Sequence, residues 1–297
     1  MPVLGRRNAL KLAGSGLLLP RYAIAQSDNR PVIRIAVQLL ATSGTLDPLA
    51  EQSNVEQRIA NSYLECLIGK NFQSKLESFP LLATAWRRID SRTVELDLRQ
   101  GVKFHNGDEL TAEDVAFSYG RERMFADTQP IGLDKTLTVA GGPPKAGSKV
   151  LPPQVAPVAR RLWPSLEKVE IVSKYVVRFV NATPDLTLEG RLTAQGSEII
   201  NRRGFEEAAT WLDYGRKPIG TGPYKVRSFV PNHELIMDAH DEYWGGRPPI
   251  RTLHFMEVPE VPNRVNGLRA GDFHFICDLP PDQIKTCLLY TSDAADE

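Results

Sequence analysis

Pro80–Tyr119 has the sequence PLLATAWRRIDSRTVELDLRQGVKFHNGDELTAEDVAFSY, and this stretch decides the fold of the chain. Within it, Val94, Leu96 and Leu98 alternate with charged residues. A period of two predicts a strand with one buried apolar face and one polar face. The stretch therefore begins with a half-buried β-strand over residues 93–99.

The second half of the same stretch predicts a turn followed by a capped helix. Asn106-Gly107 favours a tight turn, because glycine adopts positive φ at little cost. Thr111 can cap the next helix, with Asp114 reaching back to complete a capping box. Leu110 and Val115 have the spacing of a hydrophobic staple across that cap. Taken alone, these features indicate a strand, a turn and a helix in direct succession.

The amino-acid sequences of these segments resemble those of one protein family. The runs LLATAW, LRQGVKFHNGDELTAEDV and FSYGR, followed later by Pro218–Tyr224 (PIGTGPY) and Asp241–Gly246 (DEYWGG), resemble the extracytoplasmic solute-binding proteins of ABC importers. The group in question contains oligopeptide-, dipeptide- and nickel-binding proteins (family 5). The resemblance covers roughly Arg34–Gln283, with its blocks in the family's order.

The resemblance implies the fold and the domains. It predicts a mixed α/β (α+β) fold of the periplasmic-binding-protein type II kind, in which lobe I carries an accessory subdomain. Residues 26–47 would supply the first strand of lobe I and its cleft loop, 48–217 the accessory subdomain region, and 218–269 the return to lobe I. Residues 270–286 would begin lobe II, most of which is missing.

Both ends of the chain call for separate interpretation. Arg6 and Arg7 precede an apolar run, and Ala23 and Ala25 give an A-x-A cleavage site, so residues 1–25 predict an export signal and a periplasmic location. The paired arginines favour the twin-arginine route, and the general secretory route is the alternative. At the other end, Cys287–Glu297 (CLLYTSDAADE) back-translates to a transposase adapter used in sequencing libraries. We expect native sequence to end near residue 286, the alternative being a genuine polar tail.

Composition excludes some classes of partner. The chain has 36 basic and 36 acidic residues, and 42% of it is hydrophobic. This balance gives no indication of a nucleic-acid partner. No segment after the export signal reaches the roughly 20 apolar residues that a membrane span needs. The composition predicts a soluble protein, and we expect a monomer.

The remaining elements follow from local patterns. Val55–Gly69 is expected to be one helix, with apolar residues at i+4 spacing and Gly69 as its stop. Residues 128–164 are rich in proline and glycine and predict a long surface loop with at most one short helix. Further strands are expected at 32–37, 169–172, 175–179, 224–229, 234–237, 250–258 and 273–277, and further helices at 184–196, 205–214 and 263–270.

The sequence contains no catalytic constellation. Its five histidines have no i, i+4 pairing, and Cys66, Cys277 and Cys287 match no metal or redox motif. Gly220-Thr221-Gly222 lacks the lysine of a phosphate loop, and no Gly-x-Ser-x-Gly elbow occurs. We therefore predict a binding protein without a cofactor rather than an enzyme.

The resemblance implies where a solute would bind. Family contacts come from the loop after the first strand and from lobe I near the hinge, which points to Leu40, Thr42, Asp47 and Thr221. A purely structural role for each of the four stays open. The expected partners are a peptide or similar small solute and the permease subunits of the importer. The alternatives are an exported enzyme on a related scaffold and a fragment without activity, because the cleft would lack its second wall.

Overall fold

The computed structural model describes residues 28–125 and 149–281 of the 297-residue chain. The predicted export signal with Arg6, Arg7, Ala23 and Ala25 lies outside the described residues. So do residues 287–297 and most of the predicted surface loop. Within the described part, no helix combines the length and apolarity needed to cross a bilayer.

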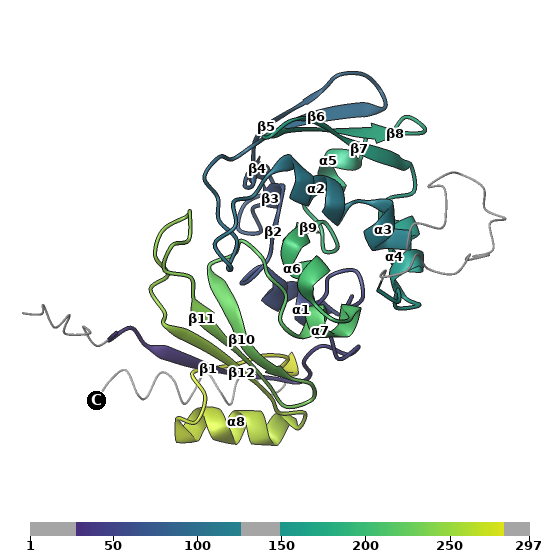
Figure 1. Ribbon diagram of the computed structural model, residues 1–297. Coiled ribbons are helices and arrows are strands. Elements are labelled where there is room, and N and C mark those ends of the chain that lie inside the picture. Colours follow the sequence, from purple (N-terminus) through teal and green to yellow (C-terminus); the bar gives the residue numbers. More distant parts are fainter. Residues whose placement is uncertain (1–27, 126–148, 282–297) are drawn as a thin grey trace, which may run out of the picture.

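A five-stranded mixed sheet forms one end of the molecule (Figure 1). Its order is β10 (Tyr224–Val230), β11 (Glu234–Ala239), β12 (Thr252–Glu257), β1 (Val32–Val37) and β13 (Phe275–Ile276). β1 runs parallel to both β12 and β13, whereas β10, β11 and β12 are antiparallel to one another. β1 thus lies between β12 and β13, in a sheet whose other strands all come from residues beyond 223.

A four-stranded antiparallel sheet forms the other end (Figure 1). Its order is β5 (Ala83–Arg88), β6 (Thr93–Leu98), β8 (Val176–Asn181) and β7 (Leu166–Ser173). Two short pairs lie between the sheets: β2 (Glu65–Cys66) with β9 (Glu198–Ile199), and β3 (Ile68–Lys70) with β4 (Ser78–Pro80).

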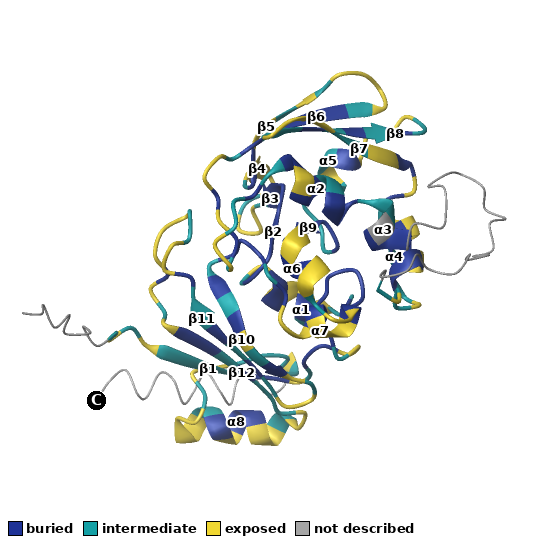
Figure 2. Ribbon diagram, in the orientation of Figure 1, coloured by how far each residue is buried: buried dark blue, intermediate teal, exposed yellow. Residues whose placement is uncertain are grey.

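The helices are short and lie mostly between or beside the two sheets. They are α1 (Asn54–Ala60), α2 (Ala112–Ser118), α3 (Arg121–Phe125), α4 (Val155–Leu162), α5 (Leu188–Arg191), α6 (Arg202–Glu207), α7 (Trp211–Arg216) and α8 (Val261–Ala270). α8 lies at the far side of the five-stranded sheet (Figure 1). Buried residues run from one sheet to the other without a break (Figure 2), so both sheets share one hydrophobic core.

The structure confirms the strand and the cap of the deciding stretch. Val94, Leu96 and Leu98 are buried in β6. Thr111 Oγ1 accepts a hydrogen bond from Glu113 N–H at 3.3 Å, and the Asp114 carboxylate accepts one from Thr111 N–H at 3.0 Å. Glu95, on the opposite face of β6, is also only 3% exposed, because Arg87 and Arg178 cover it as ion-pair partners.

The predicted hairpins and the last helix are also confirmed. β7 and β8 turn at Lys174-Tyr175, one residue later than the predicted Ser173-Lys174, because Ser173 still belongs to β7. β10 and β11 turn at the predicted Pro231-Asn232, where Asn232 has a φ of 58°. α8 ends at Gly271, whose φ of 79° is the left-handed conformation that glycine favours. Strands β12 and β13 lie inside the predicted ranges 250–258 and 273–277.

The predicted helix Val55–Gly69 is wrong beyond its first half. α1 ends at Ala60, and the chain then forms β2 and β3. Tyr63, Leu64 and Leu67 are all fully buried. The apolar residues of this segment therefore surround the backbone instead of forming one stripe, which suits short buried strands better than an amphipathic helix.

The other two helix predictions in the middle of the chain need correction as well. Only Leu188–Arg191 of residues 184–196 is helical. The predicted helix 205–214 is two helices, α6 and α7, because Thr210 begins a new one: its Oγ1 accepts a hydrogen bond from Asp213 N–H at 3.1 Å. A capping residue inside an apparently continuous pattern thus divides it.

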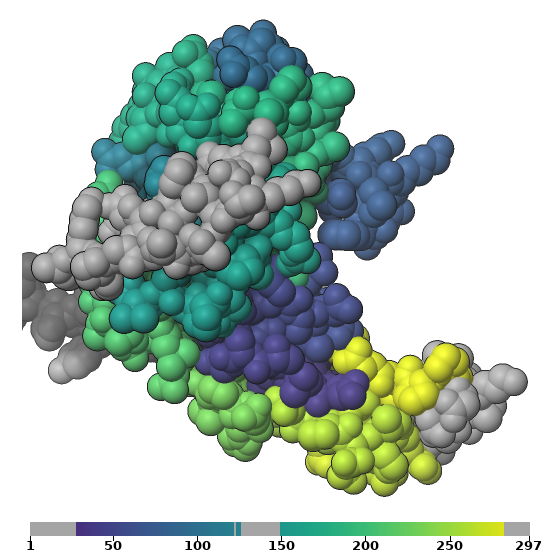
Figure 3. Space-filling model, turned by 90° about the vertical axis from the view of Figure 1, so that its right-hand side faces the viewer, coloured from purple at the N-terminus to yellow at the C-terminus, as the bar shows by residue number. Residues whose placement is uncertain are grey.

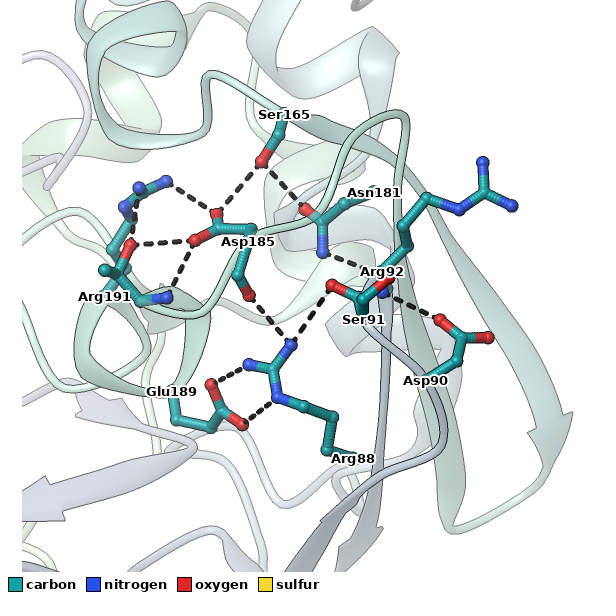
Figure 4. A network of polar contacts seen from close by, with 10 residues as sticks. Arg88, Asp90, Ser91, Arg92, Ser165, Asn181, Asp185, Glu189 and Arg191 are labelled. Carbon is teal, nitrogen blue, oxygen red and sulfur yellow. Dashed lines mark hydrogen bonds and ion pairs between the residues drawn. The ribbon is translucent and has the colours of Figure 1, made fainter.

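A polar network fixes the four-stranded sheet to the segment that follows it (Figure 4). Arg88 of β5 forms an ion pair with Glu189 and donates a hydrogen bond to the Asp185 carbonyl oxygen at 2.8 Å. Asp185 in turn pairs with Arg191 at 2.9 Å and accepts a hydrogen bond from Ser165 at 3.0 Å. The network joins the β5–β6 hairpin to residues 181–191.

Candidate functional site

A pocket of about 270 Å³ lies where the β3–β4 hairpin meets α1. In the side view the hairpin, in blue, projects from the body and leaves a hollow between itself and the yellow C-terminal part of the described chain (Figure 3). Residues of α1, β2, β3, the hairpin and the segment 193–198 line the pocket. The hairpin therefore forms one wall of a concave face.

Aromatic and aliphatic side chains form the wall on the hairpin side. Phe72 and Phe79 are 69% and 41% exposed, which is unusual for phenylalanine, and both line the pocket with Ile68. The Phe79 ring lies against Gly69, where a Cβ atom would come within 2.3 Å of it. The absence of a side chain at Gly69 thus leaves room for the tip of the Phe79 ring.

Two buried carboxylates line the inner part of the pocket. Glu65 accepts hydrogen bonds from Tyr243 Oη at 2.7 Å and Trp244 Nε1 at 2.9 Å, and burial raises its pKa. Glu198 accepts a hydrogen bond from Gly196 N–H at 2.7 Å, and burial raises its pKa to about 7. Both carboxyl groups are thus held by neutral donors.

The loop after β1 is organised by Glu51 and Glu257 rather than by exposed groups. Leu40 is buried, and its N–H donates to Glu257 Oε2 at 2.8 Å. Thr42 is exposed, and its hydroxyl donates to the Glu51 carboxylate at 3.0 Å. Burial alone would raise the pKa of Glu51, but hydrogen bonds from Ser43 hold this pKa below its ordinary value.

Asp47 and Thr221 lie in the core. Asp47 is 0% exposed and pairs with the Arg123 guanidinium at 2.9 Å; that guanidinium also stacks over the Trp211 ring at 4.8 Å. Thr221 is likewise 0% exposed and lies beside the Glu65 carboxylate. Neither side chain is accessible to a solute in this conformation. None of the four residues predicted from the resemblance lines the pocket, and as solute contacts they stay predictions.

Sequence reasoning missed the residues that do line the pocket. Gln57 of α1 and Asn61, which caps the end of that helix, are ordinary exposed residues. Glu198 lies in a two-residue strand that no periodicity reveals. The available signal was Phe72 and Phe79, two aromatic residues within an otherwise polar stretch. In the described part of the chain, no group of three His, Cys, Asp or Glu side chains could hold a metal ion.

One histidine joins the two segments on which the resemblance rests. His105, in the deciding stretch, has Nε2 3.0 Å from the Gly222 carbonyl oxygen and Nδ1 3.3 Å from Gly220 N–H. These partners fit a neutral ring with its proton on Nε2. Burial lowers the pKa of His105 to about 3. The His105 ring therefore links two segments that lie far apart in the sequence, because both of its nitrogens form hydrogen bonds with the glycine-rich turn at Gly220 and Gly222.

The chain matches one known protein family over most of its length. Residues 77–292 match the family described as bacterial extracellular solute-binding proteins, family 5 Middle. The match covers more than half of the chain, and the chain therefore belongs to this family.

Curated relatives carry several solutes in their names. The chain is 26% identical over 206 residues to the dipeptide-binding protein of Escherichia coli K12. The aligned residues cover 66% of this chain and 35% of that protein. The chain is also 30% identical over 213 residues to heme-binding protein A of Haemophilus influenzae, covering 67% and 35%. The chain thus spans about a third of the length of these relatives.

Solved structures show the same fold. The ABC transporter-associated periplasmic binding protein DppA of Helicobacter pylori, in complex with the peptide STSA, superimposes with a TM-score of 0.68 at 20% identity, over 86% of this chain and 48% of that one. The oligopeptide-binding protein AppA of Bacillus subtilis, in complex with a nonapeptide, gives a TM-score of 0.67 at 22% identity, over 86% and 45%. These identities are low, so the likeness establishes the fold and not the ligand.

Proposed function

We propose that this chain belongs to the extracytoplasmic substrate-binding component of an ABC importer for peptides. The observation that carries the proposal is the family match over residues 77–292. Relatives named for dipeptides, di- and tripeptides and oligopeptides favour peptides over other solutes. The partners in this proposal are a peptide and the permease subunits, and the chain acts in the periplasm as a monomer.

The arrangement of the sheets supports the domain assignment within this proposal. Residues 26–47 and 218–269 would build lobe I, since β1 and β10–β12 share one sheet. Residues 48–217 would hold the accessory subdomain, and 270–286 would begin lobe II. β13 lies inside that last range and pairs with β1, so we place the crossing to lobe II after Ile276. The concave face would be one wall of the cleft, and the other lobe would close over it.

Calorimetry with a small set of peptides tests the proposal. The purified chain is titrated with Ala-Ala, Ala-Ala-Ala and an oligoalanine, and we expect a micromolar dissociation constant for at least one of them. A folded chain, as judged by circular dichroism, that binds none of these peptides would contradict peptide binding by this chain and would favour the alternative of a fragment without activity.

Export by the twin-arginine route is part of the same proposal. Replacing Arg6 and Arg7 by lysine keeps the positive charge but removes the paired arginines of the signal. We expect the variant precursor to stay in the cytoplasm while the original reaches the periplasm. Equal export of both would favour the general secretory route instead.

A further inference from the structure

The pocket beneath the β3–β4 hairpin contains two carboxyl groups, Glu65 and Glu198, on which Arg99 and Arg123 act electrostatically without forming an ion pair. Glu65 and Glu198 are only 4% and 6% exposed. Their hydrogen bonds come from a phenol, an indole and backbone N–H groups. Among residues 28–125 and 149–281, no lysine, arginine or histidine forms an ion pair with either carboxylate. Burying an ionised carboxylate without a partner is costly, and a cation brought into the pocket would offset that cost.

The walls of the pocket suit a cation with an apolar stem. The aromatic residues Phe72, Phe79 and Tyr243 line the pocket, and aromatic rings attract positive charge over their faces. The amides of Gln57 and Gln195 add neutral acceptors at the rim. A volume of about 270 Å³ lies just below the usual range for whole ligands of roughly 300–1,000 Å³. The pocket therefore fits one functional group of a solute rather than the entire solute.

The charged side chains that line the pocket determine which ligand charge it favours. Lys70 is the one cationic side chain among the described lining residues, against the two carboxylates. When both carboxylates are ionised, the lining side chains carry a net charge of −1, while Arg99 and Arg123 act on Glu65 and Glu198 from outside the lining. A monocation would neutralise it, whereas an anion would meet two carboxylates at close range.

We infer that this pocket, called here the cation pocket (Glu65, Glu198, Phe72, Phe79 and Gln57), binds the guanidinium or ammonium group of a basic solute. Glu198 is the anchor, because its bonds to backbone N–H groups alone leave it free to accept a charge-assisted hydrogen bond. Glu65 contributes charge but is held by Tyr243 and Trp244. The choice of a basic peptide as the solute rests on the proposed function, while the cation chemistry rests on the pocket alone.

Proton binding at Glu198 should compete with the cation. Burial raises the pKa of Glu198 to about 7, so the carboxyl group takes up a proton as the pH falls below neutrality. Cation affinity is therefore expected to fall as the pH decreases from about 8 to about 6. Several other charged or titratable groups interact electrostatically with Glu198: Asp47, Glu56, Tyr63, Cys66, Tyr119 and Arg123. Glu65 and Lys70 line the same pocket.

Matched peptides test the inference in the whole chain. Calorimetry compares Ala-Arg-Ala with Ala-citrulline-Ala, which has nearly the same shape but no charge, and adds agmatine as a cation without a peptide bond. We expect Ala-Arg-Ala to bind at least about tenfold more tightly than its citrulline counterpart, the worth of one charge-assisted hydrogen bond. Glu198→Gln keeps the shape and the acceptor for Gly196 N–H, and should abolish this preference. The control Glu113→Gln removes an equal charge from the exposed face of α2 and should preserve it.

The outcomes separate this inference from the proposed function. If Ala-Ala-Ala binds but the arginine and citrulline peptides bind equally, the inference is overturned and the proposed function stands. If no peptide binds but agmatine binds in a manner that Glu198→Gln abolishes, the cation pocket stands and the proposed function falls. If neither agmatine nor Ala-Arg-Ala binds, or if Glu198→Gln leaves the preference intact, the cation pocket is wrong. Phe72→Ala, at a side chain already 69% exposed, should weaken Ala-Arg-Ala without affecting folding.

Discussion

Asp47 illustrates how a carboxylate can stabilise the fold rather than contact a ligand. Its position after the first strand suggested a contact in the cleft, yet its oxygens lie 2.9 and 3.1 Å from Arg123 Nη2 and are shielded from solvent. Arg123 is itself only 1% exposed and stacks on Trp211. The pair joins the loop after β1 to α3, so its first role in this structure is to hold those two segments together.

Replacing Asp47 by alanine should destabilise the protein strongly. The change leaves the Arg123 guanidinium buried without its counter-ion, which typically costs about 3–5 kcal/mol. Urea denaturation would measure the loss in the free energy of unfolding. The control Thr42→Ala removes a hydroxyl from the same loop at an exposed site and should cost under about 1 kcal/mol. Equal stability of Asp47→Ala and the original chain would show that the buried pair is not structural.

His105 should make the protein less stable in acid. Its pKa falls from 6.5 to about 3 on folding, because burial disfavours the charged ring. The unfolded chain therefore binds a proton at His105 between these values while the folded chain does not. Its contribution to stability is full above pH 6.5 and is lost as the pH falls, by at most about 1.4 kcal/mol per pH unit. The free energy of unfolding of the original chain should fall toward that of His105→Gln in this window, and a difference independent of pH would contradict the prediction.

At the scale of elements, the close packing of the turn between α7 and β10 requires glycine at positions 220 and 222. A Cβ atom on Gly222 would come within 2.7 Å of the Tyr63 carbonyl carbon, and one on Gly220 within 2.0 Å of the Tyr63 carbonyl oxygen. Gly222 N–H donates to that same oxygen at 3.2 Å. The turn thus packs backbone against backbone, and only glycine permits the approach.

Gly222→Ala should destabilise the protein by about 1–3 kcal/mol, as overpacking of a well-packed site does. The atoms that the new methyl group meets belong to the backbone and cannot rotate away. Gly190→Ala is the matched control: no atom lies within 4 Å of its Cβ position in α5, and alanine should be neutral or stabilise the helix by up to about 1 kcal/mol. Thermal denaturation of both variants would check the difference. A Gly222→Ala variant as stable as Gly190→Ala would show that the turn can move.

Sequence patterns predicted the elements whose signals are local. The capping box at Thr111, the turn at Asn232 and the stop at Gly271 each depend on a few adjacent residues, and all three form as predicted. The segment 61–69 failed because full burial removes the periodicity on which the prediction depends. The cation pocket could not be predicted, since Glu198 and Phe72 come together only through the pairing of β2 with β9 and of β3 with β4.

At the scale of the whole molecule, distant segments are held together by single side chains. β1 pairs with β12, more than 200 residues later, and Arg34 donates hydrogen bonds to the Asp272 and Gly271 carbonyl oxygens at 2.5 and 2.8 Å. Arg264 of α8 is buried and donates to the Asp278 carbonyl oxygen at 2.9 Å. The sequence contains each of these residues, but the topology that brings them together depends on contacts of long sequence separation.

The buried acids should give the molecule a stability that declines above neutrality. Burial raises the pKa of Glu56 from 4.5 to about 8 and that of Glu198 from 4.5 to about 7. In the folded state these groups hold protons that the unfolded chain has released. Their contribution is therefore complete below pH 4.5 and is lost as the pH rises to about 8. His105 acts in the opposite direction below pH 6.5, so the two effects partly cancel there and only the acids remain above it.

Glu56→Gln tests this balance, because glutamine is neutral at every pH and can still accept the hydrogen bond from Tyr63 Oη. Between pH 6.5 and about 8 the free energy of unfolding of the original chain should fall, with Glu56 contributing up to about 1.4 kcal/mol per pH unit. In Glu56→Gln the free energy of unfolding should decrease less steeply with pH, so the stability of the variant relative to the original chain should increase as the pH rises. In Glu113→Gln, at an exposed site, the free energy of unfolding should have the same pH dependence as in the original chain. Parallel curves for Glu56→Gln and the original chain would mean that Glu56 is ionised in the folded state, and the buried carboxylate would then need a cation that the described residues do not supply.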